Sequence, residues 1–221
     1  MRQACRIRRL HREAAGENMA AYIWDLDGTL LESYGVIVEG ARTAAQEAGL
    51  ADTAEEVLKG VKQASVSAYM RDAGVRAGIP FERMMERYRF HVHALDGRIT
   101  LVDGAAETLE RLRREGAAHY VYTHRGASSR PILERLGILG FFRDVVTAEM
   151  KLRPKPSGDG VKYLLEKYGL DPADTWYVGD RALDVLCAKD AGVKALLYLE
   201  PDSVVSPTGA EDRIVRSLRE I

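Results

Sequence analysis

The sequence contains little cysteine and no long apolar run, and neither sign of charge is in large excess. Its 221 residues include two cysteines, Cys5 in an arginine-rich start and Cys187 in a predicted helix. We therefore expect no structural disulfide and a reducing compartment, the cytoplasm. No apolar stretch approaches the ~20 residues of a transmembrane helix. The formal net charge of −1 gives no general attraction to nucleic acid or to an anionic membrane, so we predict neither as a partner.

The overall composition is typical of a folded protein, and residues 1–18 differ from the rest of the chain. Hydrophobic residues make up 46% of the chain and charged residues 29%, which is typical of a globular protein. The length suffices for one large domain or for a core with a smaller domain. Residues 1–18 hold five arginines and little apolar content, so we expect a disordered, dispensable extension with Met19 as the true start. A transit peptide or a phosphate-binding tail remains the alternative for this segment.

Apolar runs alternate with helical patterns over most of the chain, and glycine follows several of the helices. We predict strands over residues 20–24, 119–123, 144–147, 175–178 and 194–199, and helices over residues 105–115, 128–136, 158–168, 182–191 and 210–220. Such alternation indicates an α/β fold with a doubly wound parallel sheet, covered by helices on both faces.

Residues 35–98 interrupt this alternation. Their composition predicts helices over residues 36–48, 54–73 and 81–94, with glycine and proline between them. Mixed charge and amphipathic spacing favour a small helical bundle. We therefore divide the chain into a catalytic core, residues 19–34 and 99–221, and an all-helical cap, residues 35–98, inserted after the first strand.

The run from Asp25 to Leu30, with the sequence DLDGTL, directly follows the first predicted strand. Two carboxylates this close repel each other unless a cation or hydrogen-bond donors offset their charge. Gly28 lets the backbone turn sharply and approach a ligand. The segment therefore indicates a divalent metal beside an anionic group. An ordinary strand-end turn remains possible, whereas Leu30 and Val36 stand where a calcium loop of the EF-hand type needs glycine and glutamate.

Polar residues also follow the other predicted strands. The second core strand ends in Thr123-His124-Arg125, and a later one ends in Gly179-Asp180, with Asp184 one helical turn on. Lys155-Pro156 lies between them. Because ligands bind outside the carboxyl ends of the strands in a doubly wound sheet, we expect these side chains to converge on one edge.

These segments, in this order, resemble the four motifs of the haloacid dehalogenase superfamily of aspartate-nucleophile phosphatases. Asp25 to Thr29 match the first motif, Thr123 the second, Lys155-Pro156 the third, and Gly179-Asp180 with Asp184 the fourth. The resemblance covers residues 20 to about 200 and is greatest to the phosphoglycolate-phosphatase-like branch, whose type-one cap the helical insertion resembles. The Thr-His-Arg version of the second motif departs from the more usual Thr/Ser-Asn.

The resemblance implies a role for each acid. Asp25 is expected to attack phosphorus and carry a phosphoaspartate, and Asp27 to act as general acid and then as general base. Magnesium is expected to be held by Asp25, the backbone carbonyl of Asp27, Asp180 and Asp184.

The same resemblance assigns the remaining core residues to the phosphoryl group. Thr123 is expected to donate a hydrogen bond to it, and Lys155 to add positive charge. Gly28 and its neighbouring backbone N–H groups are expected to line the phosphate pocket. His124 and Arg125 are candidates for phosphate contact, and a structural role for both remains open.

Substrate contacts from the cap are expected from Tyr34 and Lys62. Tyr34 follows the first motif closely. Lys62, Ser65 and Tyr69 are spaced three and four apart, so a helix over residues 54–73 would present all three on one face. Solvent exposure of Lys62 is the competing interpretation. His91 and His93, two apart, do not share a helix face and make a poor metal pair.

Each of the core motif residues also has a structural interpretation that does not involve catalysis. Asp180 and Asp184 suit the start of a helix, because acids are favourable there. Thr123 suits a strand, Lys155 could be a solvated loop residue, and Lys151 competes for its role.

The motifs predict a magnesium-dependent phosphomonoester hydrolase for a small phosphorylated metabolite, as a monomer or homodimer. The substrate stays open among phosphoglycolate, sugar phosphates and nucleotides.

A sugar-phosphate mutase of the same fold is the alternative, although residues 31–40 lack the histidine that such relatives usually carry. A dehalogenase would need neither Asp27 nor Asp180, and no lysine precedes Lys59 to serve a phosphonate-cleaving enzyme. A catalytically inactive binding protein is less favoured, because none of the acids is lost.

Overall fold

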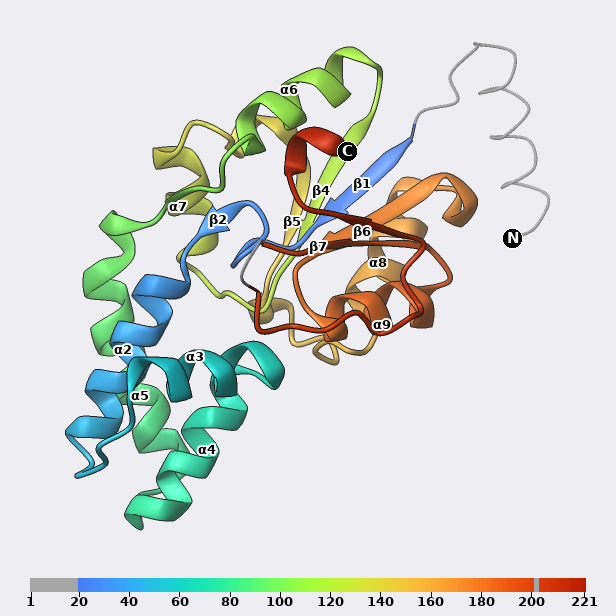
Figure 1. Ribbon diagram of the computed structural model, residues 1–221. Helices are drawn as coiled ribbons and strands as arrows, with labels where there is room; N and C mark the ends of the chain where they lie inside the picture. The colour runs from blue at the N-terminus through green and yellow to red at the C-terminus, as the bar shows by residue number, and fades with distance from the viewer. Residues whose placement is uncertain (1–19, 201–202) are drawn as a thin grey trace.

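The centre of the molecule is a six-stranded parallel sheet in the order β5-β4-β1-β6-β7-β8 (Figure 1). The structure, a computed structural model, describes residues 20–200 and 203–221. The strands are β1 (Ala21–Trp24), β4 (Ala118–Tyr122), β5 (Phe142–Val146), β6 (Thr175–Gly179), β7 (Lys194–Tyr198) and β8 (Arg213–Val215). The predicted α/β fold with a doubly wound parallel sheet is confirmed, whereas the predicted extension, residues 1–18, lies outside the described residues.

Helices cover both faces of this sheet because successive strand residues point to opposite sides. Trp24 and Val178 belong to one apolar cluster, with residues of α6 (Ala105–Arg114) and α7 (Ser129–Arg135). Ile23 and Tyr177 belong to the opposite cluster, with residues of α8 (Asp159–Tyr168) and α9 (Ala182–Ala191). β1 is buried along its whole length, so the loop that follows it starts from a rigid support.

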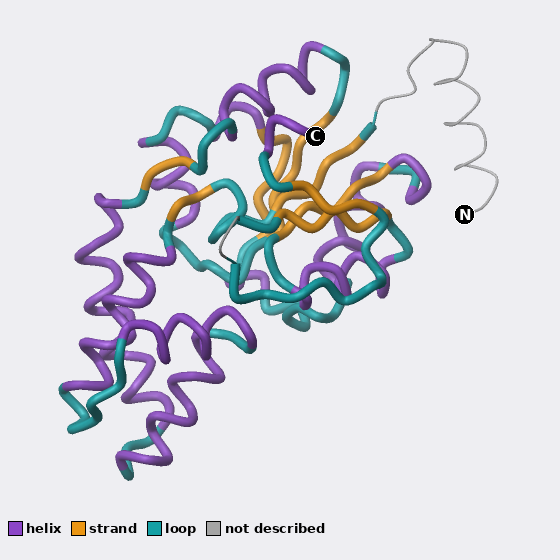
Figure 2. Tube along the Cα trace, viewed as in Figure 1, coloured by secondary structure: helices purple, strands orange, loops and turns teal. Residues whose placement is uncertain are grey.

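A group of helices lies beside the sheet (Figure 2). They are α2 (Tyr34–Gln46), α3 (Ala54–Gln63), α4 (Val66–Ala77) and α5 (Phe81–Leu95), and we call them the helical unit. The unit has its own apolar core, which includes Ile37, Met70 and Met84. A short antiparallel ribbon of β2 (Leu31–Glu32) and β3 (Thr100–Leu101) lies at its two connections to the rest of the chain. Within residues 20–200 and 203–221, no helix has both the length and the apolar character needed to cross a membrane.

Two sequence predictions of helices are wrong. The helix expected over residues 54–73 breaks at Ala64, whose φ of −122° and ψ of −91° are not helical. Ser65 is extended and accepts a hydrogen bond from the Ala68 N–H, so it begins α4 as an N-cap. The helix expected over residues 210–220 is instead the edge strand β8, paired with β7, and a 3₁₀ turn over Leu218–Glu220.

Candidate active site

The loop after β1 is a tight turn that fixes the first motif. Asp25 donates its N–H to the Val178 carbonyl at 2.8 Å, and the Leu26 carbonyl accepts from three successive N–H groups, those of residues 29, 30 and 31. Gly28 has a φ of +82°, and a Cβ there would lie 2.1 Å from Cε2 of Tyr34 and 2.5 Å from Oδ2 of Asp180. Glycine is therefore required both by the backbone conformation and by the close approach of the fourth motif.

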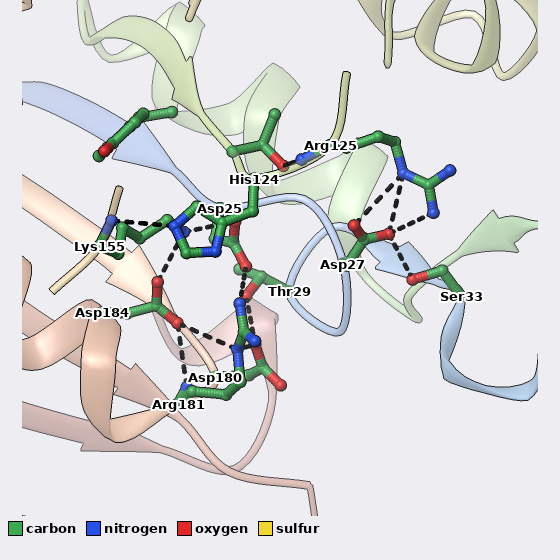
Figure 3. Close-up of polar contacts among 12 residues, drawn as sticks. Asp25, Asp27, Thr29, Ser33, His124, Arg125, Lys155, Asp180, Arg181 and Asp184 are labelled. Atoms are coloured by element: carbon green, nitrogen blue, oxygen red, sulfur yellow. Dashed lines mark hydrogen bonds and ion pairs between the residues drawn. The ribbon is translucent and has the colours of Figure 1, made fainter. Parts of the chain in front are cut away.

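Three aspartates meet at the carboxyl edge of the sheet (Figure 3). Asp25 follows β1, Asp180 follows β6, and Asp184 lies in the first turn of α9; one carboxylate oxygen of each lies within 4.8 Å of the others. All three side chains are buried. For these three aspartates, the convergence expected from the sequence is present in the structure. Asp184 also accepts a hydrogen bond from the Arg181 N–H at 3.1 Å, so the helix-start role considered for it coexists with its place in the cluster.

Lys155 is a buried cation of this cluster. Its Nζ donates to Oδ1 of Asp25 and to Oδ1 of Asp184, each at 2.7 Å. Although burial opposes its charge, these two carboxylates raise the pKa of Lys155. Lys151, the competitor for its role, is exposed. The geometry therefore favours Lys155 over Lys151 as the lysine of the site.

A second cation, Arg181, was not among the predicted site residues. Its guanidinium lies 3.9 Å from Oδ2 of Asp25, 3.9 Å from Oδ1 of Asp180 and 4.0 Å from Oδ2 of Asp184. Two positive charges thus face three carboxylates. Burial nevertheless raises the pKa of Asp25 to about 6 and that of Asp180 to about 7, whereas Lys155 and Arg181 outweigh burial and lower the pKa of Asp184.

The aspartate cluster has the donors that a hard divalent cation prefers. Within the described residues, Oδ2 of Asp25 is buried without a hydrogen-bond partner. The raised pKa values of Asp25 and Asp180 show that the charges present do not fully offset burial and mutual repulsion. These residues therefore fit a magnesium ion. The Asp27 carboxylate is not one of the three that meet here.

Asp27 is instead held on the other side of the loop, turned toward Arg125 and Ser33 (Figure 3). Arg125 donates to its Oδ1 from Nη2 at 2.6 Å, and the Ser33 hydroxyl donates to the same oxygen at 2.7 Å. Burial alone would raise the pKa of Asp27, but the Arg125 charge and these hydrogen bonds lower it. Asp27 is therefore placed as an ionised carboxylate. Arg125 contacts this carboxylate, and its direct contact with phosphate stays a prediction.

The second motif contributes two further groups. Oγ1 of Thr123 accepts the Arg125 N–H at 3.1 Å, which leaves its own hydroxyl proton free to donate elsewhere. His124 accepts the backbone N–H of Lys155 on Nε2 at 2.9 Å. Burial, followed by the charge of Lys155, lowers the pKa of His124 to about 3, so the ring is neutral. His124 thus connects the second motif to the loop that carries the catalytic lysine candidate.

Two residues of the helical unit reach the site. The Tyr34 hydroxyl donates to Oδ2 of Asp180 at 2.9 Å, and Nζ of Lys62 lies 4.3 Å from the centroid of the Tyr34 ring. Lys62 is buried and pairs with Glu200 at 3.2 Å. The shared face expected for Lys62, Ser65 and Tyr69 is absent because of the helix break, and the Tyr69 hydroxyl donates to Asp52 within the unit.

A sequence profile described as "Haloacid dehalogenase-like hydrolase" matches residues 22–198. The chain belongs to this family. It is 26% identical to the N-acetylmuramic acid 6-phosphate phosphatase of Pseudomonas aeruginosa, over 92% of this chain and 93% of the relative. It is 28% identical to a phosphoglycolate phosphatase of Agrobacterium fabrum, over 85% and 88%. A crystal structure described as a predicted phosphoglycolate phosphatase from Haemophilus somnus has the same fold, with a TM-score of 0.79, 22% identity, and coverage of 92% of this chain and 96% of that chain.

The predicted family and enzyme class, a phosphatase among the haloacid dehalogenase-like hydrolases, are therefore confirmed. Three contacts of the candidate site residues of this hydrolase were not predicted from the sequence: Arg181 among the aspartates, Ser33 on Asp27 and Glu200 on Lys62. Arg181 directly follows the predicted Asp180, so its place in the fourth motif was a usable signal. Glu200 lies 138 residues from Lys62, and no local pattern connects the two.

Proposed function

We propose that this hydrolase is a magnesium-dependent phosphomonoester hydrolase that acts on a small phosphorylated metabolite through a phosphoaspartate on Asp25. The observation that carries the proposal is the meeting of Asp25, Asp180 and Asp184 around one point, with Lys155 bonded to two of them. A nucleophilic carboxylate beside a cation-binding cluster is the arrangement that attack on an anionic phosphate requires.

Charge neutralisation decides whether such an attack is feasible. Magnesium, held by Asp25, Asp180, Asp184 and the backbone carbonyl of Asp27, would supply positive charge to the phosphate oxygens. Lys155 adds a fixed positive charge and holds the Asp25 side chain through its 2.7 Å bond to Oδ1. Thr123 offers its hydroxyl proton to a phosphoryl oxygen.

The chemistry proceeds in two half-reactions. An Asp25 oxygen forms a bond to phosphorus, the ester P–O bond breaks, and Asp27, which must be protonated at the start of this half-reaction, gives its proton to the leaving alkoxide oxygen. A water oxygen then attacks the phosphorus, the bond to Asp25 breaks, and Asp27 takes a proton from that water. The products are the alcohol and inorganic phosphate. The hydrogen bonds from Arg125 and Ser33 favour Asp27 in the ionised form that the second half-reaction needs.

We assign the selection of substrate to the helical unit, as a cap over residues 35–98. Tyr34 and Lys62 are the side chains through which the unit reaches the aspartate cluster. The relatives named for phosphoglycolate and N-acetylmuramic acid 6-phosphate support a small phosphorylated substrate. Monomer or homodimer and a cytoplasmic location stay predictions.

The direct test is phosphate release from p-nitrophenyl phosphate with magnesium and with EDTA. We expect activity that magnesium restores, and loss of at least about 10³-fold in Asp25→Asn. Asp159→Asn is the matched control, because Asp159 pairs with the exposed Arg153 outside the cluster. Acid quenching during turnover should trap label from a ³²P-phosphomonoester on Asp25. An active Asp25→Asn variant, or no trapped label under conditions that stabilise acyl phosphates, would contradict the proposal.

A further inference from the structure

Arg125 bonds two carboxylates from different parts of the chain. Its Nε and Nη2 donate to Asp27 at 3.1 and 2.6 Å, and its Nη1 donates to Oδ1 of Asp96 at 3.1 Å. Asp96 directly follows α5, at the point where the helical unit returns to the core. The Arg125 side chain is 8% exposed. It is therefore a fixed, buried fork between the first motif and the end of the helical unit.

The two oxygens of Asp27 accept different numbers of hydrogen bonds. Oδ1 accepts from Nη2, from Nε and from the Ser33 hydroxyl at 2.6, 3.1 and 2.7 Å. Oδ2 has a longer contact of 3.3 Å with Nε. One oxygen is thus anchored and the other is left with most of its accepting capacity, so the carboxylate has a defined orientation.

We propose that Arg125 is a positioning residue that holds Asp27 as the base of the second half-reaction, with Oδ2 as the oxygen that takes the proton. This inference rests on the proposed function. In that step the water oxygen bonds to phosphorus, the Asp25–phosphorus bond breaks, and the water proton moves to Asp27. Asp96 contributes by holding the third nitrogen of the guanidinium, so the orientation of Asp27 depends on the connection to α5.

A positioning role of Arg125 and direct phosphate binding by Arg125 predict different changes in kcat and KM. The specificity constant kcat/KM includes steps up to the first irreversible one, transfer to Asp25, whereas kcat includes hydrolysis of the phosphoaspartate. In Arg125→Gln we expect kcat for p-nitrophenyl phosphate to fall by roughly 10- to 100-fold. KM should fall with it, so that kcat/KM changes by less than about threefold. Rapid mixing should show a burst of p-nitrophenol and trapped phosphoenzyme at steady state.

Three further variants isolate the path through Asp27. Arg125→Lys should recover part of the lost kcat, and Asp96→Asn should show a weaker form of the same defect. In an Asp27→Asn background, Arg125→Gln should add no further loss. Arg135→Gln is the matched control: Arg135 donates to the carbonyls of Asp96 and Ile99 at the same connection, and within the described residues it makes no hydrogen bond to Asp27.

A rise in KM with unchanged kcat, or a further loss in the Asp27→Asn background, would overturn the proposal and assign Arg125 to phosphate binding. If Arg125→Gln does not fold, the Arg125→Lys and Asp96→Asn variants decide the question by the same readouts. Absence of trapped phosphoenzyme in the wild type as well as in the variants would instead count against the proposed function itself.

Discussion

The carboxyl edge of the sheet and the helical unit use charge in opposite ways. At the sheet edge Asp25, Lys155, Asp180, Arg181 and Asp184 are all buried, and the two cations offset part of the charge of the three acids. In the helical unit, pairs such as Arg83–Glu86 are mostly exposed, where an ion pair contributes little to stability. A removed charge should therefore be costly at the sheet edge and tolerated in the unit. Lys62 is a charged residue of the unit that is buried, so its removal tests whether burial or location in the unit decides the cost.

Removal of Lys155 should give the largest effect. Lys155→Met leaves Asp25 and Asp184 buried without the cation that lies 2.7 Å from each. We expect the metal-free protein to lose about 3–5 kcal/mol of unfolding free energy, and phosphatase activity to fall by at least about 10²-fold. Urea denaturation and p-nitrophenyl phosphate turnover measure the two effects.

Lys151→Met is the control for this experiment, because Lys151 is a nearby exposed lysine. Its stability and activity should remain close to those of the wild type. Equal losses in the two variants would remove the distinction between buried and exposed charge on which the comparison rests.

The protonation of His119 should give the next largest effect on stability. His119 is buried in β4, where Trp24 Nε1 donates to its Nδ1 at 3.1 Å. Burial lowers its pKa from 6.5 to about 4. Between these values the unfolded chain binds a proton that the folded protein does not, so stability falls as the pH falls from 6.5 to 4. The contribution is at most about 3 kcal/mol.

His119→Gln should remove this part of the acid sensitivity, because glutamine does not titrate. The measurement is urea denaturation at several pH values between 4 and 7, with the slope of the variant compared with that of the wild type. An unchanged slope in His119→Gln would show that another group carries the acid sensitivity.

The positions of the motif residues could be predicted because the carboxyl ends of parallel strands share one edge. The sequence placed Asp25, Thr123 and Asp180 at such ends, and the structure brings Asp25 and Asp180 together. Short apolar runs predict the strands, and a strand end fixes where its next residue lies. Local sequence information was sufficient for this part of the site.

The contacts between these residues and the rest of the chain could not be predicted in the same way. The fork of Arg125 depends on Asp96, and the pair of Lys62 depends on Glu200, which are distant in sequence. The break at Ala64 was missed because Ala64 and Ser65 are compatible with a helix, and the capping geometry of Ser65 decides against it. β8 was missed because its residues pair with β7 at an edge, where charged residues such as Arg213 are tolerated.

Arg181 should set the affinity for the metal. Its guanidinium lies 3.9–4.0 Å from oxygens of Asp25, Asp180 and Asp184, so it would repel a cation bound to the same oxygens and compete with it for their negative charge. Arg181→Gln removes this competition, so we expect magnesium to bind roughly tenfold more tightly, or about 1.4 kcal/mol, by isothermal titration calorimetry. Arg153→Gln removes the same charge from an exposed site and should leave the affinity unchanged. Unchanged or weaker binding in Arg181→Gln would show that Arg181 does not compete with the metal.

Lys62 should give the smallest effect on stability and a selective effect on catalysis. Lys62→Met keeps the length of the apolar stem and removes the charge that pairs with the partly exposed Glu200, so the unfolding free energy should change by less than about 1 kcal/mol. If the helical unit selects the substrate through Lys62, kcat/KM for the best metabolite should fall by about tenfold, with a smaller loss for p-nitrophenyl phosphate. Lys59→Met, on the exposed side of the same helix, should change neither value. An unchanged specificity constant for the best metabolite in Lys62→Met would show that this buried lysine does not contribute to substrate selection. Removal of a charge from the helical unit would then be tolerated even where the charge is buried.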